Sequence, residues 1–183
     1  LACLFAQKYK VTGFDINENR IDEINRGIDS TNEVKEGVLE AALANGMVCT
    51  NNLDDIRECN VYIVAIPTPV DDFYNPELLP LKKASTTVGK VLKKGDYVIY
   101  ESTVYPGVTE EVCAPILEEV SGLKLNEDFY LGYSPERINP GDKVHRLENI
   151  VKIVSGMDAE SLEEIKNIYD LVIEVGTWPV STI

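Results

Sequence analysis

The sequence has very little histidine, and its few cysteines do not cluster. His145 is the only histidine among 183 residues, which excludes a histidine-based catalytic triad and a multi-histidine metal site within this chain. The four cysteines, Cys3, Cys49, Cys59 and Cys113, form no Cys-x-x-Cys pair. We therefore expect reduced, buried thiols in a reducing compartment, the cytoplasm, with no disulfide and no metal.

Positive charge is also scarce, and no apolar run is long. The chain has 17 Lys and Arg against 31 Asp and Glu, a net charge of −14. Such a field repels phosphate backbones, so we expect no nucleic-acid partner. We find no apolar stretch of membrane-spanning length and no signal peptide at the start, so we expect no membrane partner. The length suits one domain with a proper core.

The sequence does contain a regular alternation of two kinds of segment. Short apolar runs alternate with segments whose apolar residues recur at the spacing of a helix. Strands are predicted at 11–16, 47–50, 61–66, 97–100, 129–133, 150–154 and 173–175. Helices are predicted at 2–9, 20–27, 33–44, 53–58, 81–92 and 109–120, and from Asp158 or Ser161 to 172. This alternation predicts an α/β fold with a doubly wound, mostly parallel sheet of the Rossmann type.

The first strand of such a fold and its Gly-x-Gly-x-x-Gly loop are not in the sequence. The chain opens inside what looks like the first helix and then supplies the second strand, which ends at Asp15. In the usual strand order the missing strand is central, so its absence leaves two inner edges unpaired. We expect the natural polypeptide to start before Leu1.

Asp15 is the first candidate site residue. A carboxylate at this strand end can accept both hydroxyls of an adenosine ribose and repels a 2′-phosphate, which favours NAD over NADP. Alternatively, Asp15 or Asn17 caps the next helix. Arg20, one helical turn further on, can lie over the adenine or ribose, or it is a solvated arginine on the helix surface.

Hydroxyl groups follow two further predicted strands. Thr68 lies between Pro67 and Pro69, and Ser102 and Thr103 follow the strand at 97–100. Each taken alone fits a rigid turn. Because the same design occurs at successive strand ends, where ligands gather in open α/β sheets, we interpret them as parts of one ligand site.

A third strand end carries charge. Glu136 follows Ser-Pro and can act as a base or position a water, or it is a helix-terminal carboxylate or a partner of Arg137. Arg137 can clamp a carboxylate or phosphate through two hydrogen bonds. Asn139 and the residues up to Asp142 also fit a plain turn.

Four motifs, taken in order, resemble the UDP-glucose/GDP-mannose dehydrogenase family. They are residues 13–17 with Arg20, 65–69, 101–104 and 134–142. The last, Ser-Pro-Glu-Arg-Ile-Asn-Pro-Gly-Asp, is similar to the bacterial UDP-N-acetylhexosamine 6-dehydrogenases of capsule, O-antigen and Vi-type polysaccharide synthesis. UDP-glucose dehydrogenases usually have Pro-Glu-Phe-Leu there. Residues 1–183 then form the amino-terminal NAD-binding domain, truncated at both ends, without the central helix and the carboxyl-terminal UDP-sugar domain.

The resemblance implies an activity and a set of residue roles. Family members oxidise the C6 alcohol of the sugar to a carboxylate, using two NAD⁺ and an enzyme thioester. The cofactor would lie beside Asp15, Arg20, Thr68 and Thr103. The sugar nucleotide would lie beside four consecutive residues: Glu136, Arg137, Ile138 and Asn139. Thr103 and Glu136 would also take part in catalysis, by positioning water or in thioester hydrolysis.

The resemblance also bears on the limits of this chain. The family's essential lysine and nucleophilic cysteine belong to parts that the sequence does not contain, so we expect this fragment to be inactive and the full-length protein to be a homodimer. Two alternatives remain open. One is the NAD domain of a β-hydroxyacid or 6-phosphogluconate type of dehydrogenase, and the other is a stand-alone nucleotide-binding module.

Overall fold

The computed structural model describes residues 1–31, 34–70, 72–135 and 150–183. The described residues fall into two compact units, 1–58 with residue 150 in the first and 59–135 with 151–183 in the second. Each unit has its own sheet, of two strands in the first and five in the second. We describe each unit by itself.

The first unit is a small two-stranded α/β structure. Its elements are α1 (Ala2–Phe5), β1 (Thr12–Phe14), α2 (Glu18–Asn25), α3 (Val38–Ala44), β2 (Val48–Thr50) and the 3-10 helix η1 (Leu53–Ile56). β1 and β2 are parallel, with Thr12 opposite Val48 and Phe14 opposite Thr50. Ala6, Leu39, Ala42 and Met47 form the buried core.

Three helices of this unit are shorter than the sequence predicts. The helix expected at 2–9 is α1, which ends at Phe5. The helix expected at 33–44 begins only at Val38, after Gly37 with φ +80°. Glycine adopts this left-handed conformation without a steric cost, so it marks a break in the chain direction. The helix expected at 53–58 is the single 3-10 turn η1. α2 agrees with the prediction and ends just before Gly27.

The second unit is built on five strands. Its elements are β3 (Val61–Val64), α4 (Leu79–Gly89), β4 (Tyr97–Tyr100), the π-helix η2 (Val108–Cys113), α5 (Ala114–Ser121), β5 (Tyr130–Tyr133), β6 (Lys152–Gly156), α6 (Ala159–Asp170) and β7 (Thr177–Val180). The strand order is β3-β4-β5-β6-β7. β3, β4 and β5 are parallel, and β6 and β7 are parallel to each other.

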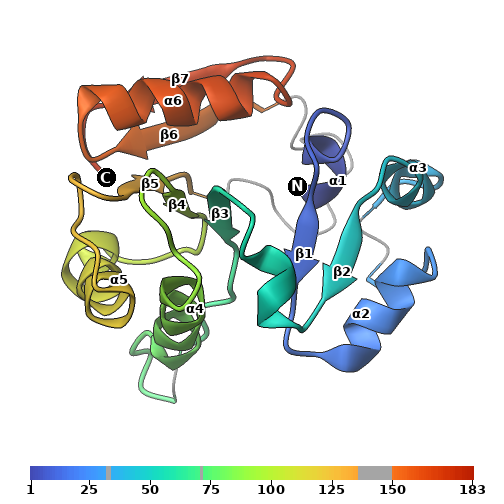
Figure 1. The fold of residues 1–183 in the computed structure, drawn as a ribbon, viewed down its shortest axis with the longest axis horizontal. Coiled ribbons are helices and arrows are strands. Elements are labelled where there is room, and N and C mark those ends of the chain that lie inside the picture. The colour runs from blue at the N-terminus through green and yellow to red at the C-terminus, as the bar shows by residue number, and fades with distance from the viewer. Residues whose placement is uncertain (32–33, 71, 136–149) are drawn as a thin grey trace. The chain divides into compact units, whose positions relative to one another are not determined.

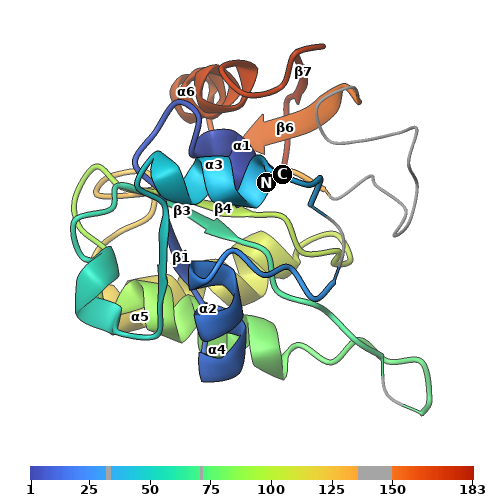
Figure 2. The ribbon, with the colours of Figure 1, turned by 90° about the vertical axis from the view of Figure 1, so that its right-hand side faces the viewer.

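Helices cover both faces of this five-stranded sheet. α4 and α5 pack together on one face, and α6 packs on β6 from the other (Figures 1 and 2). The strands between them are buried, with Val98, Ile99 and Leu131 at 0% exposure. Gly132 in β5 lets α6 approach, because a Cβ atom there would lie 2.4 Å from Ile165 Cδ1. The unit is therefore a three-layer α/β structure.

β6 departs from a fully parallel sheet, because it runs antiparallel to β5, with Tyr133 opposite Ser155. The apolar pattern of a strand shows that it is buried but not which way it runs, so the sequence did not reveal this direction. In the described part of the chain, the mostly parallel α/β fold is confirmed. Among the described strands, β1 pairs only with β2, and β3 only with β4.

The prediction of a last strand at 173–175 is wrong. Ile173 is buried after α6, and the strand β7 lies beyond Gly176, at Thr177–Val180. β7 contains Pro179 and an exposed Trp178, so it lacks the apolar run of an inner strand. Proline is tolerated at a sheet edge because its missing N–H can face away from the neighbouring strand, where the ladder has no bond to lose.

Two helices of the second unit also differ in detail. The helix expected at 81–92 begins at Leu79 and ends at Gly89. The helix expected at 109–120 is split into η2 and α5, and Pro115 lies in the first turn of α5. Proline has no N–H to donate, which fits a change of helix geometry at that point.

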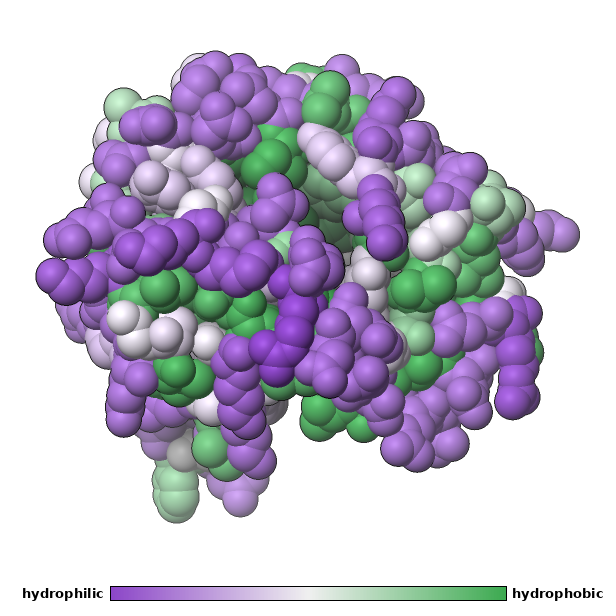
Figure 3. Space-filling model, in the orientation of Figure 1, coloured by the Kyte–Doolittle hydropathy of each residue, from purple (hydrophilic) through white to green (hydrophobic). Residues whose placement is uncertain are grey.

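Hydrophilic side chains cover most of the face in Figure 3, with separate hydrophobic areas between them. Among the residues that the structure describes, none of the helices combines the length and the apolarity that a bilayer crossing needs.

Candidate functional site

The second unit brings Thr68 and Thr103 together. β3 and β4 are neighbours and end side by side, so the residues that follow them meet. The Thr68 hydroxyl donates a hydrogen bond to the carbonyl oxygen of Thr103, while the Thr103 residue itself is exposed. The two threonine turns therefore lie together, and their place in one ligand site stays a prediction.

Serine hydroxyls tie the same strand ends to their neighbours. Ser102 Oγ accepts a hydrogen bond of 3.0 Å from the backbone N–H of Ile66. After β5, the backbone N–H of Ser134 donates to Tyr100 O at 2.9 Å, and its hydroxyl donates to Ile153 O at 2.7 Å. Ser102 and Ser134 are buried, so both serines fix the backbone while Thr103 stays accessible.

A buried ion pair lies directly before Thr103, and the sequence analysis did not assign it a role. Glu101 is 5% exposed and Lys152 is 3% exposed. Lys152 Nζ lies 3.3 Å from Glu101 Oε1, and the hydroxyl of Tyr169 donates a hydrogen bond to the same oxygen. We call Glu101, Lys152 and Tyr169 the buried cluster. The available signal was a charged residue directly after a fully apolar strand, because a carboxylate that is buried at such a place needs charged or hydrogen-bonding partners.

In the first unit, Asp15 follows β1 and is exposed. Its Oδ1 accepts a hydrogen bond of 2.8 Å from the backbone N–H of Asn17, and the helix cap is Asn17, whose side chain accepts from Arg20 N. Asp15 is thus not the capping residue of α2. Its other oxygen, Oδ2, has no hydrogen bond to any residue that the structure describes, so an accessible carboxylate oxygen remains at the strand end. This arrangement fits a ribose hydroxyl donor.

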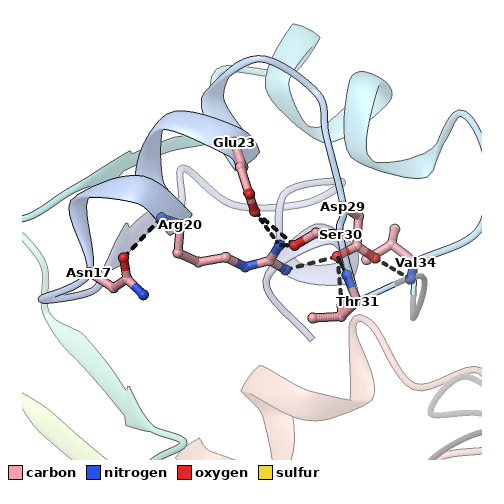
Figure 4. A network of polar contacts seen from close by, with 7 residues as sticks. All are labelled: Asn17, Arg20, Glu23, Asp29, Ser30, Thr31 and Val34. Atoms are coloured by element: carbon pink, nitrogen blue, oxygen red, sulfur yellow. Dashed lines mark hydrogen bonds and ion pairs between the residues drawn. The ribbon is translucent and has the colours of Figure 1, made fainter.

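Arg20 is held by a network of acceptors in its own unit (Figure 4). Its Nη2 lies 2.8 Å from Asp29 Oδ1, and its Nη1 donates to Ser30 Oγ at 3.2 Å and to Glu23 Oε2 at 3.5 Å. These bonds occupy the edge of the guanidinium group. They leave the flat faces of the group as the surface by which Arg20 can contact a ligand.

Asp29 is the centre of this network. Burial alone would raise the pKa of its carboxyl group, but hydrogen bonds from Arg20, from Thr31 and from the backbone N–H of Val34 lower that pKa far below its ordinary value. The hydrogen bond with Asp29 likewise raises the pKa of Arg20. Both groups are therefore charged at neutral pH, and the network fixes the direction of the arginine side chain.

All four cysteines are free thiols. Only Cys113 is buried, whereas Cys3, Cys49 and Cys59 are half-buried, so the expectation of buried thiols holds for one of the four. Burial raises the pKa of Cys3, Cys49 and Cys113, which keeps these thiols protonated and weakly nucleophilic.

Four predicted site residues, Glu136, Arg137, Ile138 and Asn139, lie outside the described residues. Asp15 and Arg20 belong to the first unit, and Thr68 and Thr103 to the second. The structure thus groups the predicted cofactor residues in two pairs.

Parallel strands with polar residues at their carboxyl ends define a nucleotide-binding domain of the Rossmann type. The sequence matches the UDP-glucose/GDP-mannose dehydrogenase family, NAD binding domain, over residues 1–173. It is 55% identical to the UDP-N-acetyl-D-glucosamine 6-dehydrogenase of Pseudomonas aeruginosa, covering 100% of this chain and 43% of that protein. It is 50% identical to the enzyme of the same name from Salmonella typhi, again over 100% of this chain and 43% of the relative.

A solved structure agrees with this match. The crystal structure of NDP-N-acetyl-D-galactosaminuronic acid dehydrogenase from Methanosarcina mazei Go1 aligns with a TM-score of 0.90 and 34% identity, covering 99% of this chain and 41% of that one. The chain therefore belongs to the UDP-glucose/GDP-mannose dehydrogenase family and carries its NAD-binding domain. The family resemblance, the Rossmann-type fold and the NAD cofactor are confirmed. The chain spans less than half the length of these relatives.

Proposed function

We propose that the protein carrying this chain is an NAD-dependent dehydrogenase that oxidises the C6 alcohol of a UDP-N-acetylhexosamine to the uronate. The observation that carries this proposal is the high identity, along the whole chain, to relatives named UDP-N-acetyl-D-glucosamine 6-dehydrogenase. The motif at 134–142, which differs from that of UDP-glucose dehydrogenases, supports an N-acetylated sugar. The product would serve capsule or O-antigen polysaccharide synthesis.

On the cofactor side, we assign Asp15 to the adenosine ribose and Arg20 to the adenosine. Asp15 presents an accessible carboxylate oxygen, and Arg20 presents the faces of a guanidinium group whose edge is held by Asp29. A guanidinium group can stack on an aromatic ring through its flat face while its edge donates hydrogen bonds. Thr68 and Thr103, joined by a hydrogen bond, would line the cofactor from the second unit.

On the substrate side, we assign Glu136, Arg137, Ile138 and Asn139 to the sugar nucleotide, as the family resemblance implies. Thr103 and Glu136 would hold the water that hydrolyses the thioester. NAD supplies the hydride acceptor for both oxidation steps. The residues of this chain would bind and orient the reactants.

We further propose that the protein acts as a homodimer in the cytoplasm. The four free thiols are compatible with a reducing compartment. Alcohol oxidation by NAD⁺ also requires a compartment that regenerates this cofactor.

The test is a substrate comparison with the purified full-length protein. NADH formation is measured with UDP-N-acetylglucosamine, UDP-N-acetylgalactosamine, UDP-N-acetylmannosamine and UDP-glucose. We expect turnover with at least one acetylated sugar and a kcat/KM for UDP-glucose that is lower by at least about ten-fold. Equal or better use of UDP-glucose would refute the assignment of an acetylated substrate.

The cofactor assignment has its own test. Asp15→Ala should weaken NAD⁺ binding, and should narrow the preference for NAD⁺ over NADP⁺, because the carboxylate that repels a 2′-phosphate is gone. Asp54→Ala, at an exposed carboxylate of the same unit, is the matched control. A wild-type protein that uses both cofactors equally would contradict the role of Asp15.

A further inference from the structure

The buried cluster of Glu101, Lys152 and Tyr169 adjoins the accessible Thr103. Strand geometry places Glu101 there, because successive side chains of β4 point to opposite faces of the sheet. The hydroxyl of Tyr100 bonds to Ser85 of α4 at 2.7 Å, on one face. Glu101, the next residue, meets Tyr169 of α6 on the other.

The antiparallel direction of β6 brings Lys152 to the same edge. Tyr133, the last residue of β5, lies opposite Ser155, so Lys152 at the start of β6 lies beyond the carboxyl end of β5. Its ammonium group also lies 5.5 Å from the centre of the Tyr169 ring, a cation–π distance. The Lys152 ammonium group from β6 and the Tyr169 hydroxyl from α6 therefore both contact the Glu101 carboxylate.

Burying such a pair is costly. Both side chains are 4% exposed, and replacing a buried ion pair by apolar residues is often neutral or stabilising. Stability alone therefore does not account for a carboxylate and an ammonium group at this point. What the cluster does provide is a fixed backbone position directly before the site.

The segment 101–103 is held at each residue. Glu101 is bonded to β6 and α6, Ser102 accepts from Ile66 N, and the carbonyl of Thr103 accepts from Thr68. Only the third residue is exposed. We propose that Glu101, Lys152 and Tyr169 are positioning residues that hold the Thr103 hydroxyl at the place where cofactor and substrate meet. This inference rests on the proposed function.

The test is a double-mutant cycle in the full-length enzyme. Tyr169→Phe removes one hydrogen bond from the Glu101 carboxylate and keeps the ring. We expect kcat to fall by about ten-fold, with the KM for the sugar nucleotide changed by less than about two-fold, because a small displacement of a reacting group costs mainly turnover. In a Thr103→Ala background, Tyr169→Phe should cause no further loss, since it acts through Thr103.

Tyr100→Phe is the matched control. It also removes a buried tyrosine hydroxyl, but on the opposite face of the sheet, so kcat should be unchanged. If Tyr169→Phe lowers kcat by the same factor with and without Thr103, the loss is a general structural effect and the inference is overturned. An unchanged kcat in Tyr169→Phe overturns it too.

Hydrogen exchange separates this inference from the proposed function. The amides of 101–105 should exchange faster in Tyr169→Phe than in the wild type, and should not change in Tyr100→Phe. Unchanged exchange in Tyr169→Phe overturns the positioning role even in an active enzyme. A wild-type protein that oxidises none of the UDP-sugars overturns the proposed function, whatever the exchange shows.

Discussion

The two units hold their principal ion pairs in different surroundings. Arg20 and Asp29 of the first unit lie in a partly exposed network, with side-chain exposures of 26% and 10%, whereas Lys152 and Glu101 of the second unit are each 4% exposed. The first pair is supported by Glu23, a hydroxyl group and backbone N–H groups close in sequence. The second joins a strand end, another strand and a helix.

This difference determines what each pair can do. A partly exposed pair keeps much of its hydration, so it contributes modestly to stability and mainly sets the direction of a side chain. A buried pair has lost its hydration, so the removal of one partner leaves a charge without compensation. The first unit therefore tolerates the loss of its pair much better than the second.

The largest effect is expected for Lys152→Met. The substitution removes the Lys152 ammonium group from beside the buried Glu101 carboxylate, which should cost about 3–5 kcal/mol of unfolding free energy. Glu101→Gln combined with Lys152→Met should lose clearly less than Lys152→Met alone, because neither charge then remains. Urea unfolding at pH 7 measures both. A loss below about 1 kcal/mol for the single variant would show that the buried cluster is not the unit's critical pair.

A second comparison between the units concerns close packing. Gly132→Ala would bring a Cβ atom to within 2.4 Å of Ile165 Cδ1 and 2.9 Å of the Ser155 carbonyl oxygen, so we expect a loss of about 2 kcal/mol from overpacking. Gly13→Ala in the first unit meets Cys49 Sγ at 2.7 Å, the end of a half-buried side chain that can rotate. Its cost should be smaller. Thermal unfolding of the two variants decides between them, and a larger loss at Gly13 would contradict this ranking.

Arg20→Met should cost about 1 kcal/mol at pH 7. Because folding lowers the pKa of Asp29, its stabilisation is complete above the unfolded-state pKa of roughly 4 and is lost as the pH falls below that value. The difference in unfolding free energy between the wild type and Arg20→Met should therefore shrink as the pH falls below about 5. Urea unfolding at a series of pH values measures this difference.

Arg26→Met provides the control for this prediction. Arg26 pairs with Asp22 on the same helix, but both side chains are about 70% exposed (72% and 68%) and the pair distance is 3.7 Å. Its removal should change stability by less than about 0.5 kcal/mol at any pH. A pH-independent loss in Arg20→Met would show that Asp29 is not the group responsible.

Effects no larger than that of Arg20→Met are expected at the helix caps. Asp158 accepts a hydrogen bond of 2.7 Å from Ser161 N, in a capping box at the start of α6. Asp158→Ala should cost about 1 kcal/mol. Asn17→Ala removes a longer bond of 3.3 Å at the start of α2 and should cost less, about 0.5 kcal/mol. Thermal unfolding measures both losses of stability. If Asp158→Ala and Asn17→Ala cost the same, the predicted difference between the helix caps of the two units is wrong.

The sequence predicted those features that depend on residues close together in the chain. β4 lies where its run of four apolar residues places it, and α6 starts at one of its two predicted caps, Asp158. The threonine turns at Thr68 and Thr103 meet because parallel neighbouring strands end at one edge. Each of these follows from local pattern and from the general rules of α/β sheets.

The features that the sequence did not reveal depend on long-range pairing. The antiparallel direction of β6 and the place of β7 are decided by which strand lies beside them, and no apolar pattern records that choice. The role of Glu101 was missed for the same reason, since its partners are 51 and 68 residues away, at Lys152 and Tyr169 (152 − 101 and 169 − 101). The sequence shows the charged residue after an apolar strand, but the distant groups that pair with it become visible only in the fold.

The strand β7 has a consequence for the solution behaviour of the protein. Among the described strands it pairs only with β6, so its other side offers backbone groups to any extended chain that approaches. Its exposed Trp178 adds an apolar contact that favours such an encounter. Pro179 interrupts the row of donors at the centre of the strand, which makes continuous cross-molecular pairing, and hence fibrous aggregation, harder to propagate.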